Sequence, residues 1–307
     1  MAASRDSLDS DLPRPLRPHQ PTSTVPLPPT DFPQSAEPKF SGHLRLEARL
    51  QSDGRTSLAK QSFRAPFHIS KPYWDGRVLQ VRVINSTAGI LSGDRLDLDV
   101  RTESGASLLV ATPAATRAFV MRSGAAECSQ RFAVEPGAWL EYSPEPLFPH
   151  RDTNYVQDTR IEVAEGGELC FADTLAPGRA GRGEIWAWKR LQIALEVSIG
   201  GEILLRERFD GAGPDLGRLA SHHGMPEAWF ATVIVISPRL EAADPLWARI
   251  RALHAKQRRV GVTRLRNSAW VVRIIATGSQ SLRDTLAEIR AILGEKLASL
   301  QSDLRRI

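Results

Sequence analysis

Four segments in the middle of the chain share one pattern, in which a glycine turn is followed at once by a short apolar run. The turns lie at Gly105, Gly137, Gly166 and Gly200, with spacings of 32, 29 and 34 residues. Each turn is preceded by a strand-like run of residues. Glycine supplies the positive φ that a tight turn between strands requires. The repeat therefore predicts hairpins that stack as layers of sheet, each burying its face on the next.

Strands are also predicted outside the repeat. Residues 44–50 and 96–100 alternate apolar and polar side chains, and residues 78–84 are a further strand candidate. Alternation places one face of a strand on a core and the other in water. The run Trp270–Ile275, apolar except for Arg273, is typical of a buried strand.

Two helices are predicted near the C-terminus. Asp244 is suited to cap a helix that has Pro245 at its first position. Residues 281–300 carry leucine and isoleucine three or four positions apart, which places them on one helical face. The predicted fold class is mainly β, with layered antiparallel sheets in a β-helix-like or sandwich-like stack and about two α-helices near the C-terminus.

The N-terminal residues differ in composition from the rest of the chain. Nine prolines fall within residues 1–38, mixed with serine, threonine and aspartate. Proline fixes φ and lacks the backbone donor that a sheet needs, so such a segment cannot build a packed core. We expect residues 1–38 to form a disordered arm and residues 39–307 to form a single β-rich domain.

Composition restricts the environment and the partners of the protein. The formal net charge of +5 is spread along the chain, whereas a nucleic-acid site needs clustered basic residues. Cys128 and Cys170 are far apart and form no CxxC motif, which favours two reduced thiols. The N-terminus has no apolar signal-peptide core, and no apolar stretch approaches the ~20 residues of a membrane span. A cytoplasmic protein that does not enter a membrane is expected.

Motifs for common enzyme chemistry are missing from the sequence. It has no GxSxG, HExxH or GxxxxGK[ST] motif. The adjacent His222 and His223 are the best candidates for metal ligands, but they could hold one metal together only from a loop. They are therefore weak candidates, and the sequence predicts a protein that binds other proteins and is not itself an enzyme.

Two alternatives stay open at this point. A layered-β carbohydrate hydrolase could use the carboxylates of Glu141 and Glu145 as its catalytic pair. It would need aromatic platforms, for which the candidates are Trp139, Tyr142, Trp186 and Trp188. A basic module for nucleic acid is the other alternative, suggested by Lys256, Arg258, Arg259, Arg264 and Arg266.

Three stretches carry more specific information. Residues 85–94 read NSTAGILSGD, and residues 109–117 read LVATPAATR, followed later by EYSPEP at residues 141–146. The third stretch, LAPGR at residues 175–179, leads to Gly183 and Glu184. In order and spacing these stretches resemble the urease accessory protein UreD family, also called UreH, from about Ser41 to Leu300. Ser92 and Arg117 depart mildly from the family pattern, which has glycine and lysine there.

The resemblance implies a scaffold without catalysis of its own. Members of this family act with UreF and the GTPase UreG on the urease subunits UreA, UreB and UreC. The assembly helps deliver nickel to the carbamylated lysine of apo-urease, and an internal passage for nickel is implied. A tightly bound cofactor is not expected, while transient nickel is. The polar residues at or near the motif positions are Asp94, Thr112, Thr116, Arg117, Glu141, Glu145, Arg151, Asp173, Arg179 and Glu184.

Two of these acidic residues have plain structural alternatives. Asp94 follows a glycine, and Gly-Asp is common turn chemistry, so a turn cap is as reasonable as a place in the passage. For Asp173 a structural ion pair with an arginine is favoured.

Overall fold

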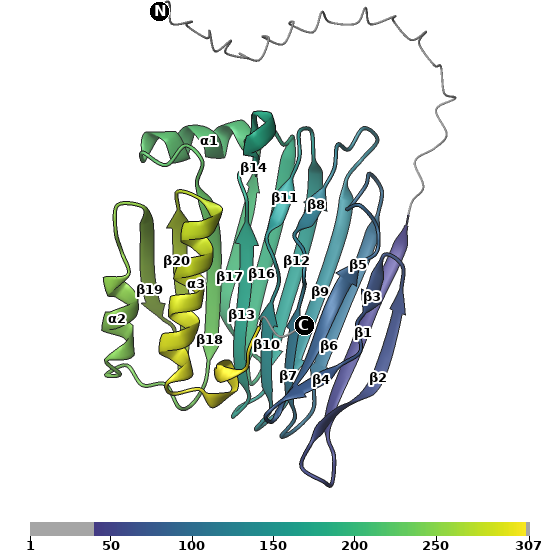
Figure 1. Cartoon of the computed structure of the whole chain (residues 1–307), viewed down its shortest axis with the longest axis vertical. Coiled ribbons are helices and arrows are strands. Elements are labelled where there is room, and N and C mark those ends of the chain that lie inside the picture. Colours follow the sequence, from purple (N-terminus) through teal and green to yellow (C-terminus); the bar gives the residue numbers. More distant parts are fainter. Residues whose placement is uncertain (1–39, 305–307) are drawn as a thin grey trace, which may run out of the picture. The chain divides into compact units, whose positions relative to one another are not determined.

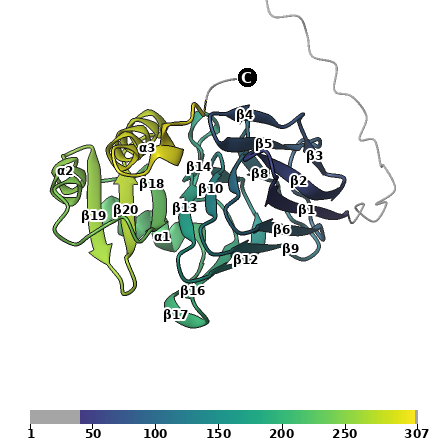
Figure 2. The same cartoon turned by 90° about the horizontal axis from the view of Figure 1, so that it is seen from below.

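The chain folds into two β-sheets that face each other across a shared core (Figures 1 and 2). The structure is a computed structural model that describes residues 40–304, so the predicted arm of residues 1–38 lies outside the described residues. The first sheet has seven strands in the order β17-β16-β12-β9-β6-β1-β2. Its strands are β1 (Ser41–Leu50), β2 (Thr56–Arg64), β6 (Arg95–Thr102), β9 (Ala126–Val134), β12 (Asn154–Val163), β16 (Arg190–Ile199) and β17 (Glu202–Gly211).

The second sheet has eleven strands, eight of which follow the order β19-β20-β18-β13-β10-β7-β5-β3. β4, β8 and β11 pair alongside this path, and β14 and β15 form a separate small hairpin. The strands are β3 (Phe67–Ile69), β4 (Tyr73–Asp75), β5 (Val78–Asn85), β7 (Ser107–Ala111), β8 (Thr116–Ala118), β10 (Trp139–Ser143), β11 (Leu147–Pro149), β13 (Glu168–Leu175), β14 (Gly178–Arg179), β15 (Glu184–Ile185), β18 (Trp229–Ile236), β19 (Arg258–Arg264) and β20 (Ala269–Ala276).

Three of the four repeated glycine turns carry the chain from one sheet to the other. Gly105 lies between β6 and β7, Gly137 between β9 and β10, and Gly166 between β12 and β13. Their φ values of 72°, 69° and 78° lie in the left-handed region that favours glycine. At Gly200, with φ 56°, the chain instead turns back into β17 of the same sheet.

The layered, mainly β architecture is confirmed, but the predicted antiparallel pairing is wrong for the central strands. Because successive repeats step along both sheets, β6, β9, β12 and β16 pair in parallel, and so do β5, β7, β10 and β13. Antiparallel pairs occur toward the edges, as in β1–β2, β16–β17 and β13–β18–β20–β19. The stack is therefore solenoid-like, built from arches between sheets.

Helices cover the outer face of the second sheet at one end. α2 (Leu246–Ala252) and α3 (Ser279–Gly294) pack on β18 and β20, burying Trp247, Trp270 and Leu293. Both predicted helices are therefore confirmed, although α2 has Pro245, not Asp244, as its N-cap. Helix α3 ends earlier than predicted, before a short 3₁₀ turn η2 (Ala298–Gln301).

A third helix, α1 (Gly213–His222), was not predicted from the sequence. Its glycines allow a close approach, since a Cβ on Gly213 would lie 2.3 Å from the carbonyl oxygen of Trp186. A Cβ on Gly217 would meet the ring of the same tryptophan at 2.6 Å. His222 is the last residue of this helix and His223 is its C-cap, so the pair does not lie on a free loop.

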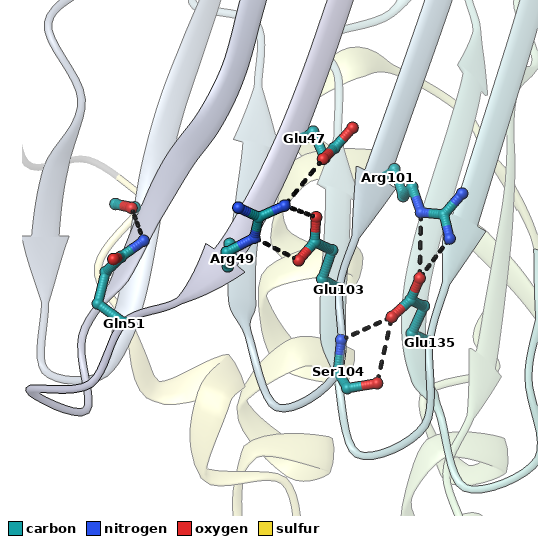
Figure 3. A network of polar contacts seen from close by, with 8 residues as sticks. Glu47, Arg49, Gln51, Arg101, Glu103, Ser104 and Glu135 are labelled. Atoms are coloured by element: carbon teal, nitrogen blue, oxygen red, sulfur yellow. Dashed lines mark hydrogen bonds and ion pairs between the residues drawn. The ribbon is translucent and has the colours of Figure 1, made fainter.

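Ion pairs join successive turns along the lower edge of the seven-stranded sheet (Figure 3). Arg49 Nε lies 2.6 Å from Glu103, and Arg101 Nε donates to Glu135 at 3.1 Å. Glu135 also accepts a hydrogen bond from the backbone N–H of Ser104 at 3.0 Å. Each pair ties one repeat to the next at the surface, where solvent and salt screen such contacts and keep them weak.

Candidate internal passage

A cavity of ≈ 310 Å³ lies between the two sheets at the end where the motif loops gather. Its wall includes the loop after β5, from Asn85 to Ile90, and the loop after β7, from Thr112 to Arg117. Two of the three recognisable stretches of sequence therefore meet at one cavity, although they belong to different repeats. The third stretch begins at the end of β13, the strand that contributes Asp173 to the cavity.

Polar side chains from neighbouring strands line the inner part of this cavity. Tyr155 Oη donates to Gln157 Oε1 at 3.2 Å, and Thr159 Oγ1 donates to Gln130 Oε1 at 3.1 Å. Gln157 Nε2 also lies 3.4 Å from Asp173 Oδ2. Burying polar side chains is costly unless they are hydrogen-bonded, and these side chains satisfy one another. They form a polar region within a core that is otherwise apolar.

Asp173 is one of the two carboxylates that line the cavity, the other being Glu145. Burial raises the pKa of Asp173 to about 6, and hydrogen bonds from the Thr174 backbone and Gln157 offset this only in part. Within residues 40–304 it forms no ion pair, so the arginine partner expected for it is not seen. Although Asp173 lies deep in the protein, it keeps some accessible surface because it faces the cavity.

Two further hollows meet the first cavity. An open groove of ≈ 550 Å³, between β17 and the strands β18 and β20, shares Leu147 and Asp173 with it. A hollow of ≈ 260 Å³ beside α3 shares Tyr142, Pro144 and Glu145 with it. Asp173 thus separates the internal cavity from the open groove, and Glu145 separates it from the hollow at α3.

The structure brings together half of the predicted motif residues. Those that line the internal cavity are Thr112, Thr116, Arg117, Glu145 and Asp173. The other five, which lie elsewhere, are Asp94, Glu141, Arg151, Arg179 and Glu184. The sequence analysis did not place Cys128, Gln130, Tyr155 or Gln157 at a site, although all of them line this cavity.

The motif residues outside the cavity have structural partners. The carboxylate of Asp94 accepts backbone N–H groups of Phe40 at 3.2 Å and Leu91 at 2.8 Å, as a turn cap does. Glu184 accepts from Arg179 Nε at 2.9 Å and lies 4.0 Å from Arg151. The Arg179 side chain holds the pKa of Glu184 below its ordinary value.

Glu141 points to the outer face of the second sheet, toward α3. Its oxygens accept two hydrogen bonds from Arg290, at 2.7 and 3.0 Å. The Glu141 side chain is 2% exposed and that of Arg290 19%. Burial raises the pKa of Glu141, and Arg290 acts in the opposite direction. This pair anchors α3 and the C-terminal turn to β10.

The geometry gives little support to the hydrolase alternative. Glu141 and Glu145 both border the hollow at α3, but Glu141 is engaged by both nitrogens of Arg290. The four aromatic residues proposed as sugar platforms are all buried, with exposed fractions from 1% to 8%. They contribute to the core and cannot present a ring to a polysaccharide.

The basic run near β19 is largely used within the protein. Arg258 pairs with Glu288 at 2.6 Å and Arg266 with Glu202 at 2.6 Å, while Arg264 lies over the ring of Trp270. Such partners leave few free cations for a nucleic acid backbone.

The described part of the chain contains no evident metal-binding site. Among residues 40–304 no group of three or more histidine, cysteine, aspartate or glutamate side chains could hold a metal ion. The rings of His222 and His223 lie edge to face, 5.4 Å apart between centroids. Burial raises the pKa of Cys128 to about 11, so this cavity thiol is not a reactive thiolate.

The fold and the cavity define a layered β protein whose internal space is lined in part by polar side chains. Comparison with known proteins agrees with this class. The family described as UreD urease accessory protein matches residues 41–307, and the chain belongs to that family.

The similarity to several individual relatives covers nearly the whole length of each relative. A protein of Opitutus terrae, described as urease accessory protein UreD, is 46% identical over 271 residues, which is 87% of this chain and 99% of the relative. Proteins of the same description from Acetivibrio thermocellus and Cupriavidus pinatubonensis are each 28% identical. They cover 83% and 87% of this chain and 98% and 94% of their own length. No helix within residues 40–304 is long and apolar enough to cross a membrane.

Proposed function

We propose that this protein acts as a scaffold in the maturation of urease, docking on apo-urease together with UreF and UreG and assisting nickel insertion. Family membership supports a role in urease maturation. The observation that carries the finer proposal is the polar cavity on which two of the three family-like sequence stretches converge. The chain acts without catalysis of its own, and its partners supply GTP hydrolysis and the nickel site.

Nickel is cargo in this proposal, and it crosses the internal cavity transiently. A divalent ion moves through a protein only if its sites bind weakly enough to release it, which favours isolated oxygen ligands over clusters of thiolates or imidazoles. The cavity offers the carboxylates of Glu145 and Asp173 at its two boundaries, with amide and hydroxyl oxygens between them. Asp173, at the border with the open groove, is the residue on which passage depends most.

The test is the nickel content of urease matured in cells that carry Asp173→Asn in place of the wild-type chain. We expect the variant to fold and to join the assembly, while the urease it matures holds several-fold less nickel. Asp158→Asn is the matched control, because Asp158 lies on β12 but faces solvent. Normal nickel content with Asp173→Asn would refute the passage, and full metallation in cells lacking the chain would refute the maturation role itself.

A further inference from the structure

A group of arginines surrounds the end of the molecule at which the internal cavity opens. Arg117 belongs to β8, which pairs with β11, and the chain continues from β11 into Arg151. Met121 N–H donates to the carbonyl of Asp152 at 3.2 Å, which brings Arg122 to the same place. We call this group the arginine rim; its members are Arg117, Arg122, Arg151, Arg179 and Arg182.

The hairpin β14–β15 completes the rim. A Cβ on Gly178 would lie 3.3 Å from the carbonyl oxygen of Pro149 in β11, so the hairpin rests directly against that strand. Figure 1 shows β8, β11 and β14 together at one end of the stack. The buried His150 lies among these charges: burial lowers its pKa, Arg179, Arg117 and Arg182 lower it further, and Glu184 acts in the opposite direction.

The rim carries an excess of positive charge that is exposed. The rim has five guanidinium groups and two carboxylates, those of Asp152 and Glu184, and Glu184 is already shared by Arg179 and Arg151. The carboxylates of Glu145 and Asp173 lie further along the cavity wall that Arg117 borders. Arg117, Arg122 and Arg182 are exposed and form no ion pair within residues 40–304. A uniform excess of one sign attracts a partner surface of the other sign and accelerates its association.

Apolar side chains accompany these charges. Val120 is 36% exposed between Arg117 and Arg122, and Pro113 and Ala114 are exposed on the loop beside the cavity. A mixture of arginine and apolar surface is typical of protein interfaces, whereas a nucleic acid backbone needs an extended basic stripe.

We infer that the arginine rim is the docking surface for an acidic segment of a protein partner in the maturation assembly, an inference that rests on the proposed function. The charge of the rim also affects whether a cation can enter the cavity. Arg117 lines the same cavity as Glu145 and Asp173, so the uncovered rim opposes the entry of a divalent cation. Carboxylates of the partner neutralise the rim, and the passage becomes accessible to the cation only in the assembled complex.

The test compares two charge-reversed forms of the full chain in binding to purified apo-urease with its accessory proteins. Arg122→Glu with Arg182→Glu alters the rim without touching the cavity wall. Arg131→Glu with Arg160→Glu is the matched control, because these arginines are exposed neighbours on β9 and β12 and the charge change is equal. Circular dichroism and thermal unfolding establish that both variants fold.

We expect the rim variant to associate about ten-fold more slowly at low salt, with a flatter dependence on salt, and the control to match the wild type. Equal association of the two variants would overturn the inference while leaving the maturation role intact. Binding of the wild type to a thirty-nucleotide RNA, lost in the rim variant while protein binding persists, would also overturn it. Failure of the wild type to bind any component of the assembly would instead count against the proposed function.

Discussion

Replacing Arg290 by methionine should destabilise the protein strongly, because it leaves the carboxylate of Glu141 buried and without its partner. Glu141 is 2% exposed and relies on two hydrogen bonds from Arg290. Breaking a buried pair by removing one partner costs about 3–5 kcal/mol. Arg290 is itself 19% exposed, so water can reach part of the site and we expect the lower end, about 3 kcal/mol.

The loss should depend on pH with a definite sign. Burial raises the pKa of Glu141 in the folded protein, and removing Arg290 removes the group that lowers it. A carboxyl group whose folded pKa exceeds its unfolded pKa destabilises the fold at high pH, and the penalty is relieved as pH falls and the group takes a proton. The difference between wild type and Arg290→Met should therefore shrink from pH 8 toward pH 5.

Chemical denaturation at several pH values measures both effects. The double variant Glu141→Met with Arg290→Met is the control, since it removes both charges and should recover most of the lost stability. The reasoning is refuted if Arg290→Met loses less than about 1 kcal/mol at pH 8, or if its deficit does not change with pH.

Three further results are expected from denaturation measurements. Gly178→Ala should cost about 2 kcal/mol or more, because φ is 120° and the new Cβ would lie 2.2 Å from the Glu184 carbonyl oxygen. Gly181→Ala, with open space around it, should be nearly neutral, and equal effects would contradict this account. Arg101→Ala should cost only about 0.5 kcal/mol, and less at high salt, since its pair with Glu135 is exposed; a larger loss would mean that these pairs hold the repeats together. Asp173→Asn should stabilise the protein by up to about 3 kcal/mol above pH 6, because burial raises the folded pKa of Asp173 to about 6; the gain shrinks as pH falls below 6 and disappears below about pH 3, where the wild-type carboxyl is protonated in both states.

The layered β fold could be predicted because its strands alternate and its turns carry glycine, and both are local properties. The direction of pairing could not. The sequence pattern of a strand, a glycine turn and a second strand is the same for a hairpin within one sheet and for an arch that connects two sheets. Gly105 and Gly200 both adopt positive φ, yet only the turn at Gly200 closes a hairpin. The choice depends on contacts between repeats about thirty residues apart, which no single repeat contains.

Helix α1 was missed for a related reason. Its glycines lower helix propensity by about 1 kcal/mol each, so the segment does not look helical in isolation. They are needed because Trp186 presses against the helix at Gly213 and Gly217. Tertiary packing therefore decides this helix against its own local preference.

The sequence does contain evidence for the cavity, but it is visible only when one knows which residues of each strand point inward. On β9 and β12 the inward positions carry Gln130, Gln157 and Thr159, in line with apolar residues such as Phe132 and Ile161. A polar side chain at an inward position costs stability unless it is hydrogen-bonded, and an apolar residue there would pack more simply. Three such positions on two neighbouring strands, at the level of Asp173, are hard to explain by folding alone. If Asp173→Asn raises stability while it lowers nickel delivery, the polar interior exists for passage and is kept at the expense of the core.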